Sequence, residues 1–179
     1  MRSVVATVLH RCVLQPHPSG EVPVVNSISV EIHDGPRLHV RIVDSSNQLV
    51  LPQGSLDPTR LWEHTCVELF MARSGGPGYV EWNFSPTGQA TRFDFTSYRE
   101  RTGEAFPDSM RITCSREGGF TRLEVEGPML IPDFDRAAVT AVVRSRAGQC
   151  GYWALSHPRE TPDFHDSAGF VLSPADFGC

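Results

Sequence analysis

The sequence predicts an all-β protein, an antiparallel β-sandwich of the jelly-roll or immunoglobulin-like kind with short helical turns in its loops. Three observations predict it. Glycine and proline, 15 and 14 residues, punctuate the whole chain. The runs between them are short, apolar or alternating, and of strand length. No long segment has the 3.6-residue apolar period of a helix. At 179 residues, with no linker or repeat, we expect a single domain over residues 1–179.

The elements follow from this punctuation in chain order. Strands are predicted at residues 4–9, 25–32, 37–43, 65–72, 78–84, 89–95, 110–115, 120–126, 138–146, 151–155 and 169–172. Helical turns are predicted at 57–62, where Asp57 caps and Pro58 takes the first position, and at 133–137. Residues 16–23 and 99–107 are predicted to be surface loops.

The most informative stretch is a predicted hairpin within residues 61–88. Successive strand side chains point to opposite faces of a sheet. One face is predicted to pack in the core: Val67, Leu69, Met71, Val80, Trp82 and Phe84. The other face adds acid and amide groups: Cys66, Glu68, Phe70, Tyr79, Glu81 and Asn83. A carboxylate and an amide in mid-sheet suggest a platform for a polar ligand.

The turn lengths predict the register of three strands. Closing the first hairpin over residues 73–78 places Glu68 opposite Asn83 and Phe70 opposite Glu81. Closing the second over residues 85–88 places Glu81 opposite Arg92. The core face then gains Thr91, Phe93 and Phe95, and the polar face gains Ala90, Arg92 and Asp94.

Two interpretations of the polar face remain open. Carboxylates, amides and guanidinium groups form bidentate hydrogen bonds with hydroxyl pairs, as sugar recognition requires. Alternatively, the face is solvated, and Glu81 and Arg92 form an ordinary cross-strand ion pair.

The tryptophans divide between core and loop. Trp82 and Trp153 lie within predicted strands and are expected in the core. Trp62 lies in a polar loop just before a strand, where side chains often contact ligands. Its alternative role is to plug one end of the sandwich.

A segment near the C-terminus carries His157, Asp163, His165 and Asp166. These groups suit a metal or acid–base chemistry, but their spacing matches no zinc motif, and hydrogen-bonded structural histidines are the favoured interpretation. A hydrolytic set of Ser156, His157 and Asp163 is disfavoured, because no G-x-S-x-G elbow is present.

Composition excludes several classes of function. The net charge of −5 and pI of about 5.8 argue against nucleic-acid binding. All 16 basic residues are arginine, which excludes Schiff-base and P-loop lysine chemistry. The five cysteines form no C-x-x-C pair, so we expect free thiols in a reducing compartment. The apolar runs are too short for a secretory segment or a membrane span, and we expect a cytoplasmic protein with no membrane partner.

Five motifs occur in an order that resembles a known family: LWEHTCVELF, YVEWNFSPTGQ, FTSYR, YWALSHP and PDFHDSAGF. They are similar to those of DOMON-like proteins that resemble family 9 carbohydrate-binding modules, over roughly residues 22–172. The resemblance implies a β-sandwich whose relatives bind sugars or, in other branches, haem.

The resemblance also implies roles for particular residues. In those modules a sugar lies between two aromatic rings, and a carboxylate, an arginine and amides hold its hydroxyls. Trp62 and Glu68 match the first ring and the carboxylate, and Arg92 matches the arginine. The second ring comes from the loop that offers Phe164, in place of a tryptophan. Several such modules carry structural calcium, whose ligands do not map onto this sequence.

The leading prediction is a non-catalytic domain that binds a small sugar or sugar derivative beside Trp62. Its ligand-binding residues would be Trp62, Glu68, Asn83, Arg92, Phe164 and His165. The first alternative is a hydrolytic enzyme acting on a sugar or cell-wall derivative through Glu68 and the loop histidines. The others are a haem-binding DOMON protein and a protein-interaction module. No catalytic residue, metal ligand or cofactor is predicted; calcium and haem are the alternatives that the resemblance raises. The oligomeric state is not predicted.

Overall fold

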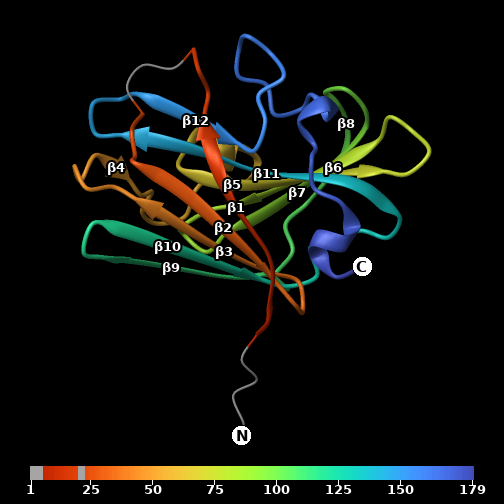
Figure 1. Cartoon of the computed structure of the whole chain (residues 1–179), viewed down its shortest axis with the longest axis horizontal. Helices are drawn as coiled ribbons and strands as arrows, with labels where there is room; N and C mark the ends of the chain where they lie inside the picture. Colours follow the sequence, from red (N-terminus) through yellow and green to blue (C-terminus); the bar gives the residue numbers. More distant parts are fainter. Residues whose placement is uncertain (1–5, 20–22) are drawn as a thin grey trace, which may run out of the picture.

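The computed structural model describes residues 6–19 and 23–179 (Figure 1). Its strands are β1 (Val8–Pro16), β2 (Ser27–His33), β3 (Arg37–Val43), β4 (Leu49–Val50), β5 (Cys66–Arg73), β6 (Tyr79–Phe84), β7 (Ala90–Ser97), β8 (Glu100–Ala105), β9 (Arg111–Glu117), β10 (Phe120–Glu126), β11 (Phe134–Ser145) and β12 (Cys150–Ala154). Its 3₁₀ helices are η1 (Pro58–Glu63), η2 (Ser167–Gly169) and η3 (Pro174–Phe177). None of the helices described is long and apolar enough to cross a membrane.

The strands form one curled antiparallel sheet, in the order β8-β7-β6-β5-β11-β12-β1-β2-β3-β10-β9, with β4 beside β11. The curl brings the β1–β2–β3–β10–β9 part over the β5–β6–β7 part, as Figure 1 shows. An all-β antiparallel fold is thereby confirmed. The sheet is a half-barrel, so the finer prediction of a jelly-roll or immunoglobulin-like sandwich is not confirmed.

The main core lies between these two parts of the sheet. Val30 on β2 and Val40 on β3 are fully buried in the same cluster as Leu69 on β5 and Val80 on β6. The core also takes in Trp82, Trp153 and Met71, as the alternation predicts. A smaller apolar cluster lies on the other face of β5–β7, beneath the C-terminal segment: Phe70, Ala72, Tyr79, Phe93, Phe95, Ala138 and Phe170.

Most predicted strands are present with shifted ends, and those at 37–43 and 120–126 have the predicted bounds. The predicted turn at 57–62 is η1, which Asp57 caps by accepting a hydrogen bond from Thr59 N, with Pro58 at its start. The predicted free thiols are confirmed, since all five cysteines are unpaired.

Four predictions of elements are wrong. The loop at 99–107 contains β8, which alternation misses because this edge strand is exposed along almost its whole length. The strand at 4–9 is β1, which continues to Pro16; residues 4 and 5 lie outside the described residues. The turn at 133–137 is instead the start of β11. The strand at 169–172 is reduced to a single bridge between Leu172 and Ala137, after η2.

Candidate functional site

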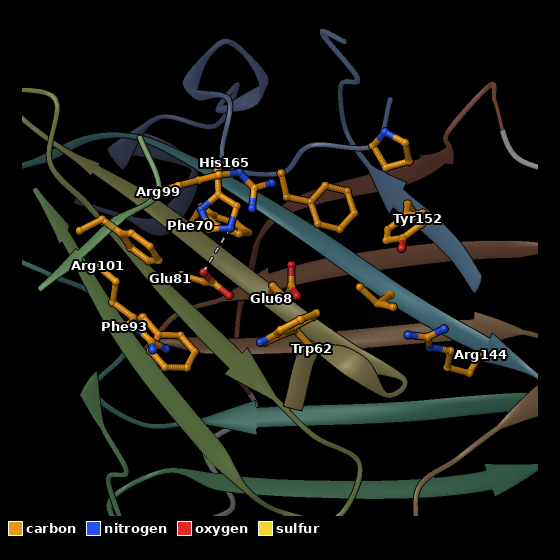
Figure 2. A pocket seen from close by; sticks show the side chains of 14 residues that line it. Trp62, Glu68, Phe70, Glu81, Phe93, Arg99, Arg101, Arg144, Tyr152 and His165 are labelled. Carbon is orange, nitrogen blue, oxygen red and sulfur yellow. Dashed lines mark ion pairs between the residues drawn. The ribbon is translucent and has the colours of Figure 1, made fainter. Parts of the chain in front are cut away.

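A cavity of about 480 Å³ lies on the face of β5–β7 and β11 that points away from the main core (Figure 2). Strands, η1 and the segment after β12 contribute to its walls. The lining residues are Trp62, Glu68, Phe70, Glu81, Phe93, Phe95, Arg99, Arg101, Val142, Arg144, Tyr152, Pro162, Phe164 and His165.

Two buried carboxyl groups form the floor, and Figure 2 shows them near the centre of the cavity. Glu68 on β5 is 3% exposed, and its Oε2 accepts a hydrogen bond from Thr140 Oγ1 at 3.0 Å. Glu81 on β6 is 5% exposed, and its Oε1 accepts from Asn83 Nδ2 at 2.6 Å. Strand alternation explains the placement, because both side chains point away from the core face that carries Leu69 and Val80.

Burial makes these carboxyls weaker acids than an exposed glutamate, since low-dielectric surroundings disfavour the charged form. Burial raises the pKa of Glu68 well above its ordinary value, and the neighbouring Glu81 raises it further. Burial likewise raises the pKa of Glu81 to about 7, although Asn83, Arg99 in the β7–β8 turn and Arg101 on β8 act to lower it. Near neutral pH the floor therefore carries carboxyl O–H groups, which can donate hydrogen bonds to the hydroxyl oxygens of a ligand.

His165 stands beside Glu81 and contacts Tyr79. The Tyr79 hydroxyl accepts a hydrogen bond from Arg99 N at 3.0 Å and lies 2.8 Å from His165 Nδ1. The hydroxyl keeps its own proton for the contact with Nδ1, which favours the tautomer that carries the imidazole proton on Nε2. His165 Nε2 is 3.7 Å from Glu81 Oε2, the contact dashed in Figure 2.

This histidine is neutral near pH 7. Burial lowers the pKa of His165 to about 4, and the charge of Arg99 lowers it further. Burial also raises the pKa of Tyr79 to about 12, so its hydroxyl keeps its proton. The Glu81–His165 contact is therefore not a full ion pair near pH 7, because the imidazole is uncharged and Glu81 is only partly ionised.

A polar clamp holds the segment that carries His165 against the β7–β8 hairpin. Asp163 accepts hydrogen bonds from the Tyr98 hydroxyl at 2.7 Å and from Arg99 Nη2 at 3.0 Å. It also accepts from the backbone N–H of His165 at 3.1 Å. Burial acts to raise the pKa of Asp163, but these hydrogen bonds outweigh it and leave the pKa below its ordinary value. The clamp joins residues more than sixty positions apart in the chain.

Aromatic side chains from two distant segments wall the cavity. Trp62 projects from η1 and is 46% exposed, while its neighbour Leu61 is buried and anchors the turn. Across the cavity Tyr152 on β12 meets Phe164 edge to face, with ring centroids 5.9 Å apart. A sugar ring presents apolar C–H faces that pack well against such walls, and its hydroxyls reach the floor.

Arginines line the cavity beside the carboxyls. Arg99 is held by Asp163, and Arg101 stacks its guanidinium over Phe93 at 4.9 Å. Arg144 on β11 donates from Nε to the carbonyl of Glu63 at 2.9 Å, and it has no ion pair with an acid of the described chain. These groups are placed to donate hydrogen bonds to a ligand's oxygens.

The cavity brings together four of the six residues predicted to bind a ligand: Trp62, Glu68, Phe164 and His165. Asn83 is fully buried beneath them, where it orients Glu81. Glu68 lies opposite Asn83 and Phe70 opposite Glu81, as the first hairpin predicts.

Arg92 is elsewhere, and the predicted register of the second hairpin is wrong. Trp82, not Glu81, is opposite Arg92, so Arg92 shares the face of Trp82 and pairs with Asp94 at 2.7 Å. The cause is one extra loop residue. Ser85 N donates to Gln89 O, and Gly88 takes a positive φ of 91°, which is the three-residue loop with a glycine bulge.

The one-residue shift moves every side chain of β7 to the other face. Phe93 and Phe95 therefore line the cavity instead of joining the main core, while Ala90 packs in that core. The proposed Glu81–Arg92 ion pair does not form.

Sequence reasoning did not single out several cavity residues as functional. Phe70 was on the correct face, and its position two residues after Glu68 was the usable indication. Arg101 was missed with β8 and Arg99 with the turn before it, the face of Arg144 on β11 was not assigned, and Tyr152 was not considered as a ligand contact.

The other histidine of the loop takes a structural role. His157 Nε2 bonds the carbonyl of Gln15 at 2.8 Å, and its ring meets His17 edge to face. Met71 is in the main core, as predicted, on the opposite face of the sheet from the cavity.

Comparisons with known proteins support the fold. No protein-family model and no curated protein matches the chain. The structure is similar to a crystal structure of a proposed carbohydrate-binding protein from Bacteroides uniformis. The TM-score is 0.54 at 17% sequence identity, over 88% of this chain and 83% of that one. At this identity the similarity establishes a shared fold, and the DOMON-like family assignment stays a prediction.

Proposed function

We propose that the chain is a non-catalytic domain that binds a small carbohydrate or sugar derivative in the cavity between Trp62 and Phe164. The observation that carries the proposal is the floor of two buried carboxyls, Glu68 and Glu81, between aromatic walls. The similarity to a proposed carbohydrate-binding protein supports it. The order of the five motifs supports DOMON-like membership as part of the same proposal.

The floor suits hydroxyl groups better than ionic ones. A protonated carboxyl both donates and accepts a hydrogen bond, as a sugar hydroxyl does. The raised pKa values of Glu68 and Glu81 keep protons on this pair near pH 7, so a ligand hydroxyl meets partners without leaving an isolated buried charge.

The dimensions suit a small ligand. The cavity of about 480 Å³ lies within the range of about 300–1,000 Å³ typical of small-molecule sites. Its aromatic walls come from η1 and from the segment after β12. A sugar ring can pack its apolar C–H faces between them. If the chain is cytoplasmic, the ligand is an intracellular sugar, a sugar nucleotide or a cell-wall precursor.

Calorimetric titration with neutral, N-acetylated and acidic mono- and disaccharides tests the proposal. Trp62→Ala and Glu68→Gln are each expected to weaken binding by at least about ten-fold, equivalent to about 1.4 kcal/mol. Phe106→Ala is a matched control, because Phe106 has the same 46% exposure as Trp62 and does not line the cavity. Arg92→Ala is a second control on the other face of the sheet.

Two results would contradict the proposal. One is the absence of millimolar or tighter binding to any of these sugars. The other is binding that the Trp62 and Glu68 substitutions leave at the wild-type affinity.

A second candidate function is acid–base catalysis at the same floor. The observation that favours it is Glu81, whose pKa of about 7 suits proton transfer at neutral pH, beside Glu68 and 3.7 Å from His165. Hydrolysis of chromogenic glycosides with a bell-shaped pH profile is the expected result. Glu81→Gln would then abolish turnover and leave sugar binding measurable, whereas binding without turnover excludes this candidate.

A further inference from the structure

The β2–β3 hairpin carries two histidines and a glutamate on its outer face. Glu31 and His33 are two residues apart on β2, and His39 on β3 is the cross-strand partner of Glu31. Alternation turns all three away from the core, into which Val30 and Ile32 point. One ligand atom from each of the three lies within 4.8 Å of the others. Among the residues described, no other trio of this kind meets that distance.

His33 is the residue that marks the cluster. Its side chain is 6% exposed, and neither ring nitrogen has a hydrogen-bond partner within the described parts of the chain. Its Nε2 is 3.3 Å from Glu31 Oε2, without the geometry of a hydrogen bond. Buried polar atoms are nearly always paired, so an imidazole with both nitrogens unpaired calls for a partner.

The distances suit one ion. Ligand atoms about 2.0–2.2 Å from a tetrahedral metal are about 3.3–3.6 Å from each other. The His33 Nε2–Glu31 Oε2 separation of 3.3 Å is already that of such an edge. The remaining separations in the group are within 4.8 Å, and the partly exposed His39 is the more accessible of the two histidines.

The charges around the cluster come from three strands. Arg11 on β1 donates from Nε to Glu31 Oε1 at 2.8 Å, which leaves Oε2 for another partner. Glu124 on β10 is opposite His39 and lies 3.8 Å from Arg122. Arg37, opposite His33, is paired with Glu126. Each of these three guanidiniums is thus beside a carboxylate, and Glu124 is opposite His39.

We propose that Glu31, His33 and His39 form a binding site for a divalent transition metal of the zinc class. Two imidazoles select such metals over calcium and magnesium, which prefer oxygen ligands. Three protein ligands leave a fourth position for water. The site is separated from the sugar-binding cavity by the main core and does not depend on that proposal.

The test is titration of the whole, tag-free chain with Zn²⁺ by calorimetry and with Co²⁺ by visible absorption. A one-to-one complex is expected, with the ligand-field bands of a nitrogen- and oxygen-ligated Co²⁺ ion. His33→Gln, His39→Gln and Glu31→Gln are each expected to weaken binding more than about ten-fold, the lower bound for removing even an outer partner of a metal site. Zn²⁺ is expected to raise the Tm of the wild type only, and a chelator to reverse the rise.

The controls are His64→Gln, an exposed histidine outside the cluster, and His157→Gln, which removes the other close histidine pair. If His33→Gln does not fold, the variants of the partly exposed His39 and Glu31 decide the question. The proposal is overturned by no binding, by binding that persists in all three site variants, by loss in His157→Gln alone, or by a thiolate-to-Co²⁺ charge-transfer band.

Discussion

The hairpins β5–β6 and β2–β3 have the same alternation of apolar and polar side chains but different surroundings. Both turn one face to the main core. On β5–β6 the other face is also buried, so that every residue of β5 except Arg73 is inaccessible. On β2–β3 the other face stays partly open, and buried residues alternate with accessible ones.

The difference lies in what covers the second face. The segment after β12 crosses β5–β7 and brings Phe164 and His165 against Phe70. The outer face of β2–β3 has charged partners from neighbouring strands instead, such as Arg11 on β1. The same residue type therefore acquires opposite properties: burial raises the pKa of Glu81, whereas the hydrogen bond from Arg11 lowers that of Glu31. The position of a glutamate in an alternating strand therefore does not predict its pKa. The prediction also needs the segments that cover that face of the sheet.

The largest expected effect concerns the second buried face of β5. Phe70→Ala removes a ring that contacts Tyr79, His165 and Phe170, and it is expected to lower the free energy of unfolding by about 3–5 kcal/mol. Ser29→Ala, on the open face of β2, should change it by less than about 0.5 kcal/mol. Urea denaturation of both variants measures the contrast. Equal small effects would mean that the C-terminal cover does not create a second core.

The next effect is the opposite pH dependence of the two glutamates. The folded-state pKa of Glu81 is about 7 against an ordinary value of 4.5, so between these pH values the unfolded chain binds fewer protons than the folded one. The free energy of unfolding should fall by about 3 kcal/mol as pH rises through this window. The lowered pKa of Glu31 acts in the other direction. Its contribution to the free energy of unfolding is lost only as the pH falls below 4.5, the ordinary pKa of a glutamate.

Urea denaturation of wild type and Glu81→Gln from pH 4 to 8 measures this dependence. The variant is expected to have a shallower decline between about pH 4.5 and pH 7. Identical declines in the two proteins would contradict the assignment of the dependence to the cavity floor.

The smallest effect is expected on the open face. Arg11 and Glu31 form an ion pair of 2.8 Å, but their side chains are 70% and 37% exposed. A double-mutant cycle of Arg11→Ala and Glu31→Gln in chelator-treated buffer should give a coupling below about 1 kcal/mol, because solvent screens the pair. A coupling of several kcal/mol would show that this face is more enclosed than its exposure indicates.

Alternation and the turn residues were enough to predict the β class, most strands, the core tryptophans and the first hairpin register. They were enough because each strand has an apolar face that must be buried, which fixes the side on which Glu68 and Trp82 lie. Four of the six predicted ligand residues reach one cavity for the same reason.

The errors have local and distant causes. Arg92 was misplaced because the bulge at Gly88 adds one residue to the loop, and a single added residue inverts a whole strand. Arg101 was missed because an exposed edge strand has no apolar alternation, and Arg99 was missed with it because it lies in the turn that leads into this strand. The clamp between Tyr98 and Asp163 joins segments 65 residues apart, and no local pattern encodes such a contact.

The order of strands in the sheet also determines how the chain must assemble. Four of its pairings join remote segments: β1 with β12, β5 with β11, β3 with β10, and β4 with β11. Each closes a long loop before its contacts can compensate the lost chain entropy, which places folding in the slow, millisecond-to-second class of all-β proteins. During synthesis from the N-terminus, β5 has an unpaired edge until β11 emerges. The carboxyl floor that rests on this strand pair therefore forms late in biogenesis.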